Sequence, residues 1–203
     1  YCREAFDWLQ RLLAADGSVE PRSRARALFV SSHLLTFFGD RTVARGLAET
    51  SLQLSQALDD REGIVNASWM LGNLYELDDR ARPYFEASLS LAHEIGYTFG
   101  AMHCLTYYGR FEMLLGRYGA AITLLHECEG EARKLGGDLD QLADCRAYLG
   151  EIAMLQGDNG AAGALLQPQI VQERGHGRHL GELDHLAPAQ ETDGTSDGHQ
   201  LPL

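Results

Sequence analysis

The feature that most constrains this fold is a set of small residues that recurs at matched distances from short turns. Three segments end in a turn that contains a glycine, at Gly39, Gly116 and Gly157. Two helices joined by a tight turn approach closely only where small side chains face each other. The chain therefore reads as a series of antiparallel helix pairs. The four small-residue columns are Ala27, Ala67, Cys104 and Cys145; Ser32, Gly72, Gly109 and Gly150; Ala44, Ala81, Ala121 and Ala162; and Ser51, Ser88 and Cys128.

Large apolar residues are expected to fill the space around each helix crossing. Those on the first helices of the pairs are Leu34, Leu74, Phe111 and Ile152, and those on the second helices are Leu47, Tyr84, Leu124 and Leu165. Glycine just past a helix predicts a left-handed cap. The second turn has Leu77-Asp78-Asp79 in place of the usual glycine, so we expect the weakest joint of the array there.

The pattern predicts an all-α architecture with three parts. Residues 1–23 would be the end of a preceding repeat plus a linker, with a lone helix over about 2–14. Four helix pairs would occupy 24–167, and residues 168–203 would be a low-complexity, disordered tail. The expected pairs are 24–38 with 41–58, 62–77 with 79–95, 99–115 with 118–135, and 139–155 with 158–167.

The run from Gly109 to Ala121, followed by Leu125 and Cys128, resembles the tetratricopeptide repeat. The small-residue column repeats after 40, 37 and 41 residues, which is longer than the usual period of about 34. This length, with the segments 82–92 and 4–9, resembles the longer repeats of bacterial LuxR-type and maltose-activator-like regulators and related signalling ATPases. The resemblance implies a right-handed α–α superhelix that binds proteins, peptides or small effectors.

In proteins of that kind the repeats form a sensor or scaffold region next to a nucleotide-binding module. The only lysine of this chain is Lys134, so a phosphate-binding loop ending in Gly-Lys-Ser/Thr is excluded within it. The leading hypothesis is therefore the binding region of a larger bacterial signalling or transcriptional regulator. The alternative is a free-standing protein–protein adaptor, and a nucleotide-binding loop upstream of Tyr1 would separate the two.

By analogy with that family, four positions of each first helix point into the concave face. Aromatic rings there could stack on a ligand, asparagines could bond a peptide backbone, and arginines could bind carboxylates. The alternative is that Trp69 packs between neighbouring repeats and the polar side chains are only solvated. The candidate binding residues are Arg26, Phe29, His33, Asn66, Trp69, Asn73, Glu76, His103 and Arg110.

Enzyme activity is not expected from this sequence, and no cofactor is predicted. His33, His103 and Glu76 could meet on the concave face, which leaves a helical enzyme as a remote third hypothesis. The histidines of the tail, including His176 and His179, have metal-ligand spacing, but a glycine-rich tail offers no preorganised geometry. We therefore predict no metal site.

Charge and composition narrow the choice of partners. The net charge is −12 with an isoelectric point near 5.0, which disfavours nucleic acid and anionic membranes. No apolar stretch approaches the roughly 18 residues that span a bilayer. The four cysteines form no C-x-x-C pair, which favours free, buried, reduced thiols in a cytoplasmic protein.

The two ends of the sequence carry expectations of their own. The chain begins Tyr1-Cys2-Arg3 without methionine, so we expect the true N-terminus to lie upstream. The repeat pattern stops at Pro168 and shortens the last helix, which would leave apolar surface for self-association through an uncapped C-terminal repeat. A frameshift, a misplaced gene end or a linker at the end of a shortened chain would explain the change of composition there.

Overall fold

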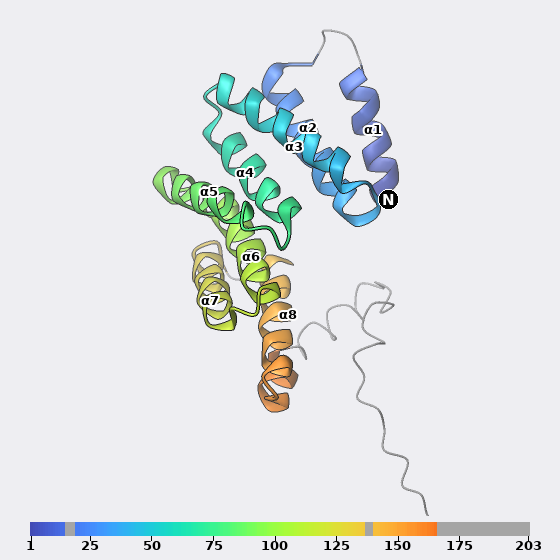
Figure 1. The fold of residues 1–203 in the computed structure, drawn as a ribbon. Coiled ribbons are helices and arrows are strands. Elements are labelled where there is room, and N and C mark those ends of the chain that lie inside the picture. The colour runs from blue at the N-terminus through green and yellow to red at the C-terminus, as the bar shows by residue number, and fades with distance from the viewer. Residues whose placement is uncertain (15–18, 137–139, 166–203) are drawn as a thin grey trace, which may run out of the picture. The chain divides into compact units, whose positions relative to one another are not determined.

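The computed structural model describes residues 1–14, 19–136 and 140–165, and within these ranges the chain is helical with short turns and without strands (Figure 1). A further helical stretch covers 159–165. The chain divides into two units, Tyr1–Gln167 and Pro168–Leu203. The second unit, on which the predictions of a disordered tail and a frameshift fall, lies outside the described residues. The helices are α1 (Cys2–Ala14), α2 (Pro21–Phe38), α3 (Arg41–Ala57), α4 (Arg61–Tyr75), α5 (Ala81–Ile95), α6 (Thr98–Leu114), α7 (Tyr118–Lys134) and α8 (Asp140–Leu155).

The helices pack as antiparallel pairs, α2 with α3, α4 with α5 and α6 with α7. Ser32 near the end of α2 donates to the carbonyl of Ala44 near the start of α3, at 2.8 Å. Ser51, late in α3, donates to the carbonyl of Ala25, early in α2, also at 2.8 Å. These bonds fix the two helices in opposite directions. The all-α, superhelical arrangement of stacked pairs is therefore confirmed.

Small residues lie where the helices of each pair cross, as predicted. Ala44, Ala81 and Ala121 have no exposed surface. A Cβ atom added to Gly72 would lie 2.8 Å from the ring of Phe85, and one added to Gly109 would lie 2.8 Å from Leu125. A side chain at either position would therefore push the facing side chain, Phe85 or Leu125, out of its place.

The same crossing carries a repeated hydrogen bond. The residue of the fourth small-residue column donates to a carbonyl of the first helix in each pair. Ser51 donates to Ala25, Ser88 to Val65 at 2.9 Å, and the thiol of Cys128 to Met102 at 3.6 Å. The side chain at this buried position is therefore both small and able to donate a hydrogen bond.

The large apolar residues predicted for the second helices pack against the core but do not lie deepest in it. Leu47, Tyr84, Leu124 and Leu165 are only partly buried. The next residues along, Ala48, Phe85 and Leu125, are fully buried and lie at the crossing. On α2, Leu34 is partly buried and Leu35 takes the core position. The first-helix residues Leu74, Phe111 and Ile152 are buried as predicted.

Most of the turns have the predicted glycine with a left-handed backbone just past the helix, but three positions differ. Gly96, Gly116, Gly136 and Gly157 have positive φ and cap their helices in the left-handed region. The prediction for Gly39 is wrong: its backbone is extended, and a Cβ there would meet the side chain of Leu35. Asp59 and Glu76 have a positive φ, of 50° and 49°, without being glycine.

Candidate functional site

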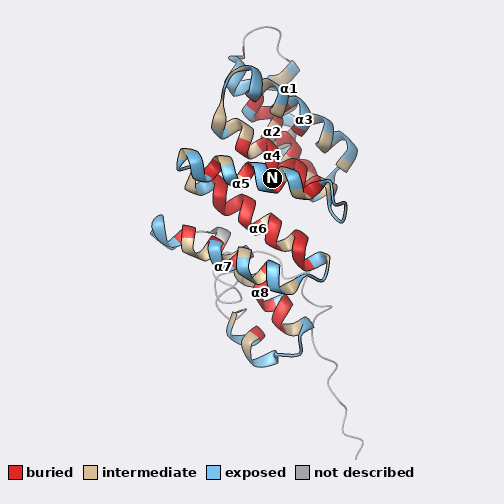
Figure 2. Cartoon of the chain, turned by 60° about the vertical axis from the view of Figure 1, so that its left-hand side comes forward, coloured by how far each residue is buried: buried red, intermediate tan, exposed pale blue. Residues whose placement is uncertain are grey.

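The first helices of the pairs, α2, α4, α6 and α8, contact one another in chain order and form one continuous face. We call this the first-helix face. It contains the positions that the sequence predicts for binding. Burial is heavy along its middle helices, as the red of α4 and α6 shows in Figure 2.

Trp69 lies at the centre of this face and is only 1% exposed. Its ring stacks on Tyr107 of α6, with centroids 5.0 Å apart and planes 5° apart. Phe29 and His33 of α2 meet it edge-on at 5.5 and 5.6 Å, and His103 of α6 lies 5.3 Å away. We call these five residues the ring ladder. It joins three helix pairs through one side chain.

Polar atoms inside the ring ladder are hydrogen-bonded to their neighbours. His33 Nε2 lies 3.3 Å from the hydroxyl of Tyr107. The indole N–H of Trp69 donates to Asn66 Oδ1 at 3.4 Å, and Asn66 in turn donates to the Tyr97 hydroxyl at 3.4 Å. The rings of His33, Trp69 and Tyr107 are therefore fixed in orientation as well as packed.

The ring ladder is kept uncharged by burial. Desolvation lowers the pKa of His33 to about 4, with a smaller contribution from His103. Desolvation also lowers the pKa of His103, while its hydrogen bond from Nδ1 to the carbonyl of Phe99 opposes this. Burial raises the pKa of Tyr107, and that of Tyr148 on α8 to about 12. The interior of the face thus presents neutral rings at neutral pH.

The structure brings five of the nine predicted binding residues together: Phe29, His33, Asn66, Trp69 and His103 meet in or beside the ring ladder. The remaining four lie around it. Of the three residues considered for catalysis, only the two histidines share this cluster.

The four remaining candidates have different surroundings. The side chain of Arg26 is 72% exposed and lies 3.8 Å from Glu62. Arg110 is half-buried, and its charge lowers the pKa of Tyr107 and of Tyr148 against the effect of burial. Asn73 and Glu76 belong to the end of α4, where Arg41 of α3 donates to the Asn73 carbonyl at 2.9 Å and pairs with Glu76 at 3.1 Å.

Sequence reasoning missed three rings of this face. Tyr107 closes the ladder, Phe37 lies 5.5 Å from His33, and Phe99 lies 4.4 Å from His103. Whereas Phe29, His33 and Tyr107 are only partly exposed, Phe37 is 66% exposed and Phe99 is 49% exposed. Their spacing of four residues from His33 and His103 was the signal that could have found them.

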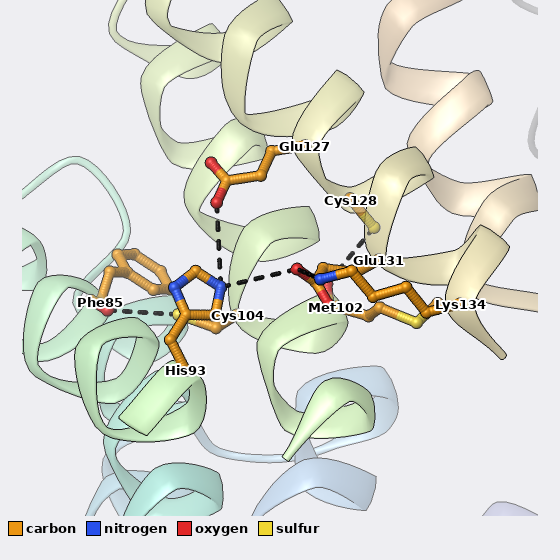
Figure 3. Close-up of polar contacts among 8 residues, drawn as sticks. All are labelled: Phe85, His93, Met102, Cys104, Glu127, Cys128, Glu131 and Lys134. Carbon is orange, nitrogen blue, oxygen red and sulfur yellow. Dashed lines mark hydrogen bonds and ion pairs between the residues drawn. The ribbon is translucent and has the colours of Figure 1, made fainter. Parts of the chain in front are cut away.

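A cavity of about 320 Å³ lies on another part of the molecule, between α5, α6 and α7. Figure 3 shows three of its lining residues, His93, Glu131 and Lys134, with their polar contacts. His93 Nε2 lies 3.8 Å from Glu127 and from Glu131. Lys134 pairs with Glu131 at 2.6 Å. The ionisable side chains that line this cavity thus already contact one another. Among the described residues, no three candidate ligands are placed to hold a metal ion. The lining residues are Ala92, His93, Gly96, Thr98, Ala101, Glu131 and Lys134.

All four cysteines are free, but the prediction that all are buried is wrong for Cys2, which is exposed. Cys128 of α7 and Cys145 of α8 lie with their sulfurs 2.8 Å apart. The hydroxyl of Thr106 lies 3.1 Å from Cys145 and 3.4 Å from Cys128. The hydrogen bond with Cys128 and burial both raise the pKa of Cys145, and burial raises that of Cys104 to about 12. Cys104 and Cys145 therefore act as packing residues, whereas the hydrogen bond from Cys145 lowers the pKa of Cys128.

Comparison with known proteins identifies the fold and leaves the family open. No family model and no curated protein sequence matches the chain. A solved structure that resembles it is BtubC (BKLC) from P. vanneervenii, with a TM-score of 0.64 at 15% identity. The match covers 98% of this chain and 81% of BtubC. Within the part of the chain that the structure describes, no helix is long and apolar enough to cross a membrane.

Proposed function

We propose that this chain is a tetratricopeptide-like binding module that takes a peptide segment of a protein partner, or a small effector, on its first-helix face. In this proposal it is the sensor or scaffold region of a larger bacterial signalling or transcriptional regulator in the cytoplasm. It acts by binding and not by catalysis. The observation that carries the proposal is the convergence of neutral rings from three helix pairs onto one face, with exposed rings at its border.

The border of the face has the chemistry to hold a peptide. Phe37 and Phe99 offer exposed rings next to the ladder, and aromatic side chains contribute strongly to binding when a partner covers them. Arg26 lies three residues before Phe29 on α2, and Arg110 lies three residues after Tyr107 on α6. Guanidinium groups bind carboxylates with two parallel hydrogen bonds. A segment that combines apolar and acidic side chains would suit this surface.

The buried ladder has a different task in this proposal. Trp69 is too deeply buried to stack on a partner in the state described here. Its contacts with α2 and α6 hold the helices that carry Phe37, Phe99, Arg26 and Arg110 in fixed relative positions. Preorganisation of this kind reduces the ordering cost of binding.

Selection from a random dodecapeptide library displayed on phage tests the proposal. We expect enriched peptides to combine acidic and apolar residues. Binding of the synthetic peptides should fall at least tenfold in the variants Phe37→Ala, Phe99→Ala and Arg110→Glu. Val43→Ala, which removes an exposed apolar side chain from α3, should leave binding unchanged. Equal losses in all four variants, or no enrichment, would reject the first-helix face as the site.

Upstream sequence distinguishes the regulator from a free-standing adaptor that uses the same face. A nucleotide-binding module encoded before Tyr1 favours the regulator. A start codon close to that position favours the adaptor.

A further inference from the structure

The stack brings the fourth small-residue column of one helix pair next to the first column of the following pair. At the boundary between α5 and α6, burial raises the pKa of the Cys104 thiol, and a hydrogen bond with Ser88 partly opposes this. At the boundary between α7 and α8 the same two columns supply Cys128 and Cys145, whose side chains are also in contact. The second of these boundaries therefore has a thiol on both sides.

Cys128 and Cys145, which we call the thiol pair, touch without being bonded. Their sulfurs lie 2.8 Å apart, and neither residue has exposed surface. The hydroxyl of Thr106 on α6 lies within hydrogen-bond distance of both sulfurs. A disulfide bond is about 2.05 Å long, so the sulfurs need to approach by only about 0.8 Å to form one.

The hydrogen bond at the crossing of α6 and α7 does not by itself call for a thiol. At the same column position Ser51 and Ser88 donate to the first helix of their pair at 2.8 and 2.9 Å. The Cys128 sulfur lies 3.6 Å from the carbonyl of Met102 (Figure 3). A thiol is a weak donor, and serine would fill the same small space and donate more strongly. What the thiol adds at position 128 is its contact with the sulfur of Cys145.

The two thiols differ in acidity, as the two steps of disulfide formation require. The hydrogen bond from Cys145 lowers the pKa of Cys128, and the hydroxyl of Thr106 acts in the same direction against the effect of burial. The hydrogen bond with Cys128 and burial raise the pKa of Cys145. Because the thiolate is the form of cysteine that attacks oxidants, Cys128 is the residue that reacts first.

We propose that the thiol pair is a site of reversible oxidation, at which a hydroperoxide converts Cys128 and Cys145 into a disulfide that ties α7 to α8. The Cys128 thiolate attacks an oxygen of hydrogen peroxide, and the O–O bond breaks to release hydroxide and leave a sulfenic acid. The sulfur of Cys145 then attacks that of Cys128, the S–O bond breaks, and the oxygen leaves as water with the Cys145 proton. Overall, two thiols and one peroxide give one disulfide and two water molecules.

Burial determines how this site meets its oxidant. The sulfurs are enclosed in the packed state, so peroxide reaches them during a local opening of α8 away from α6 and α7. The disulfide joins residues 17 positions apart and therefore favours the docked state of α8 over the open one. A dithiol reductant reverses the reaction by two thiol–disulfide exchanges, which makes the bond transient in a reducing compartment.

Oxidation of the whole chain with a small excess of hydrogen peroxide tests the proposal. Cys2→Ser is the starting protein, because Cys2 is exposed and would react on its own. We expect two of the three remaining thiols to be lost, together with two hydrogen atoms in the intact mass, and dithiothreitol to restore both. Trypsin cleaves after Arg133 and Lys134, between the cysteines of the thiol pair, so mass spectrometry of the linked peptides identifies the bond.

The repeat itself supplies matched control variants in the same Cys2→Ser background. Cys128→Ser introduces the residue that the first two helix pairs carry in this column, and Cys145→Ala does the same for its own column. Both variants should fold and neither should form the disulfide. In Cys145→Ala the reaction should stop at a sulfenic acid on Cys128, which dimedone traps. Cys104→Ala should form the disulfide in the same yield as the Cys2→Ser protein.

Three results would overturn the proposal. One is the retention of all three thiols after prolonged treatment with peroxide. Another is a disulfide that includes Cys104. The third is direct oxidation of Cys128 to a sulfinic acid while Cys145 stays reduced.

Hydrogen exchange measures the consequence for the fold. After oxidation the amide protons of α8 should exchange roughly tenfold more slowly or better, because the bond to α7 suppresses the opening of α8. The amide protons of α3, in the first helix pair, should keep their rates. Dithiothreitol should return α8 to its original rates. Unchanged exchange in α8 after complete disulfide formation would show that the bond does not hold the helix in place.

Discussion

Helices α1 and α6 differ more than any other two helices in how deeply they are buried. α1 has no buried residue, whereas α6 buries twelve of its seventeen. The reason is the number of neighbours: α6 contacts α4, α5, α7 and α8, while α1 contacts α2. The apolar residues of α1 lie on defined faces, and those of α6 surround the helix. In a stack of helix pairs, the position of a helix therefore determines whether its apolar residues lie on part of its surface or all round it.

The two tryptophans of the chain test this comparison most directly. Trp69→Ala should destabilise the fold by about 3–5 kcal/mol, because it leaves a cavity at the centre of the ring ladder. Trp8→Ala should change the stability of the monomer by less than about 0.5 kcal/mol, since its side chain is exposed. Urea unfolding at low protein concentration measures both. Similar losses for the two variants would contradict the burial difference.

Acidification should lower the free energy of unfolding, whereas the free energy of unfolding at neutral pH should stay unchanged. The pKa of His33 is lowered to about 4, so the unfolded chain binds the proton first as the pH falls below about 6.5. Stability should therefore decrease from pH 6.5 to pH 4, by up to about 3 kcal/mol from this residue.

The variant His33→Phe should reduce the dependence on pH, measured by chemical unfolding at several pH values. Phe29→Leu is the matched control, because it removes a ring of the same ladder but no titrating group. It should lower stability at every pH and keep the slope. A wild-type slope in His33→Phe would show that other groups cause the acid sensitivity.

A buried ion cluster distinguishes the interior from the charged surface of α1. Glu112 of α6 is 1% exposed and lies 2.7 Å from Arg82 of α5 and 3.5 Å from Arg117. Arg82→Met should cost about 2–3 kcal/mol, because one of the two partners of a buried carboxylate is lost. Arg11→Met on α1 should change monomer stability by less than about 0.5 kcal/mol. Thermal unfolding compares the two variants.

Glycine substitutions give the smallest and most local effect. Gly109→Ala should cost about 1–2 kcal/mol, since the new methyl group meets Leu125 at the crossing of α6 with α7. Gly130→Ala on α7 meets no atom within 4 Å and should stabilise the fold by about 0.5–1 kcal/mol. Opposite signs in calorimetric melting temperatures are the expected result. Equal signs would argue against close packing at Gly109.

The helices and their crossings could be predicted from the sequence because two helices approach closely only where small side chains face each other. The expected helix ends lie within three residues of the observed ends. The side-chain register on the second helices could not be fixed as well. Adjacent apolar residues such as Tyr84 and Phe85 are equivalent in the pattern, and only packing shows that Phe85 lies at the crossing.

The sequence could predict where the residues of the candidate site lie, but not whether each one packs in the interior or faces solvent. The family positions led to Trp69, His33 and His103, but not to Tyr107, which stacks on Trp69. Whether an aromatic side chain on a first helix faces solvent or a neighbouring repeat depends on the distance between repeats. That distance follows from the packing of whole helices and is absent from the local pattern. The positive φ of Glu76 was likewise hidden, because glycine marks a positive φ at Gly96, Gly116, Gly136 and Gly157.

The ring ladder also determines how the stacked helix pairs unfold. Stacked repeats that touch only their neighbours can unfold one at a time from an end. Here the side chains of α2 and α6 contact each other as well, since His33 reaches Tyr107 across α4. Loss of one helix pair therefore removes contacts from the other two. Amide protons of α2, α4 and α6 should exchange together, as one cooperative block, while those of α1 exchange earlier.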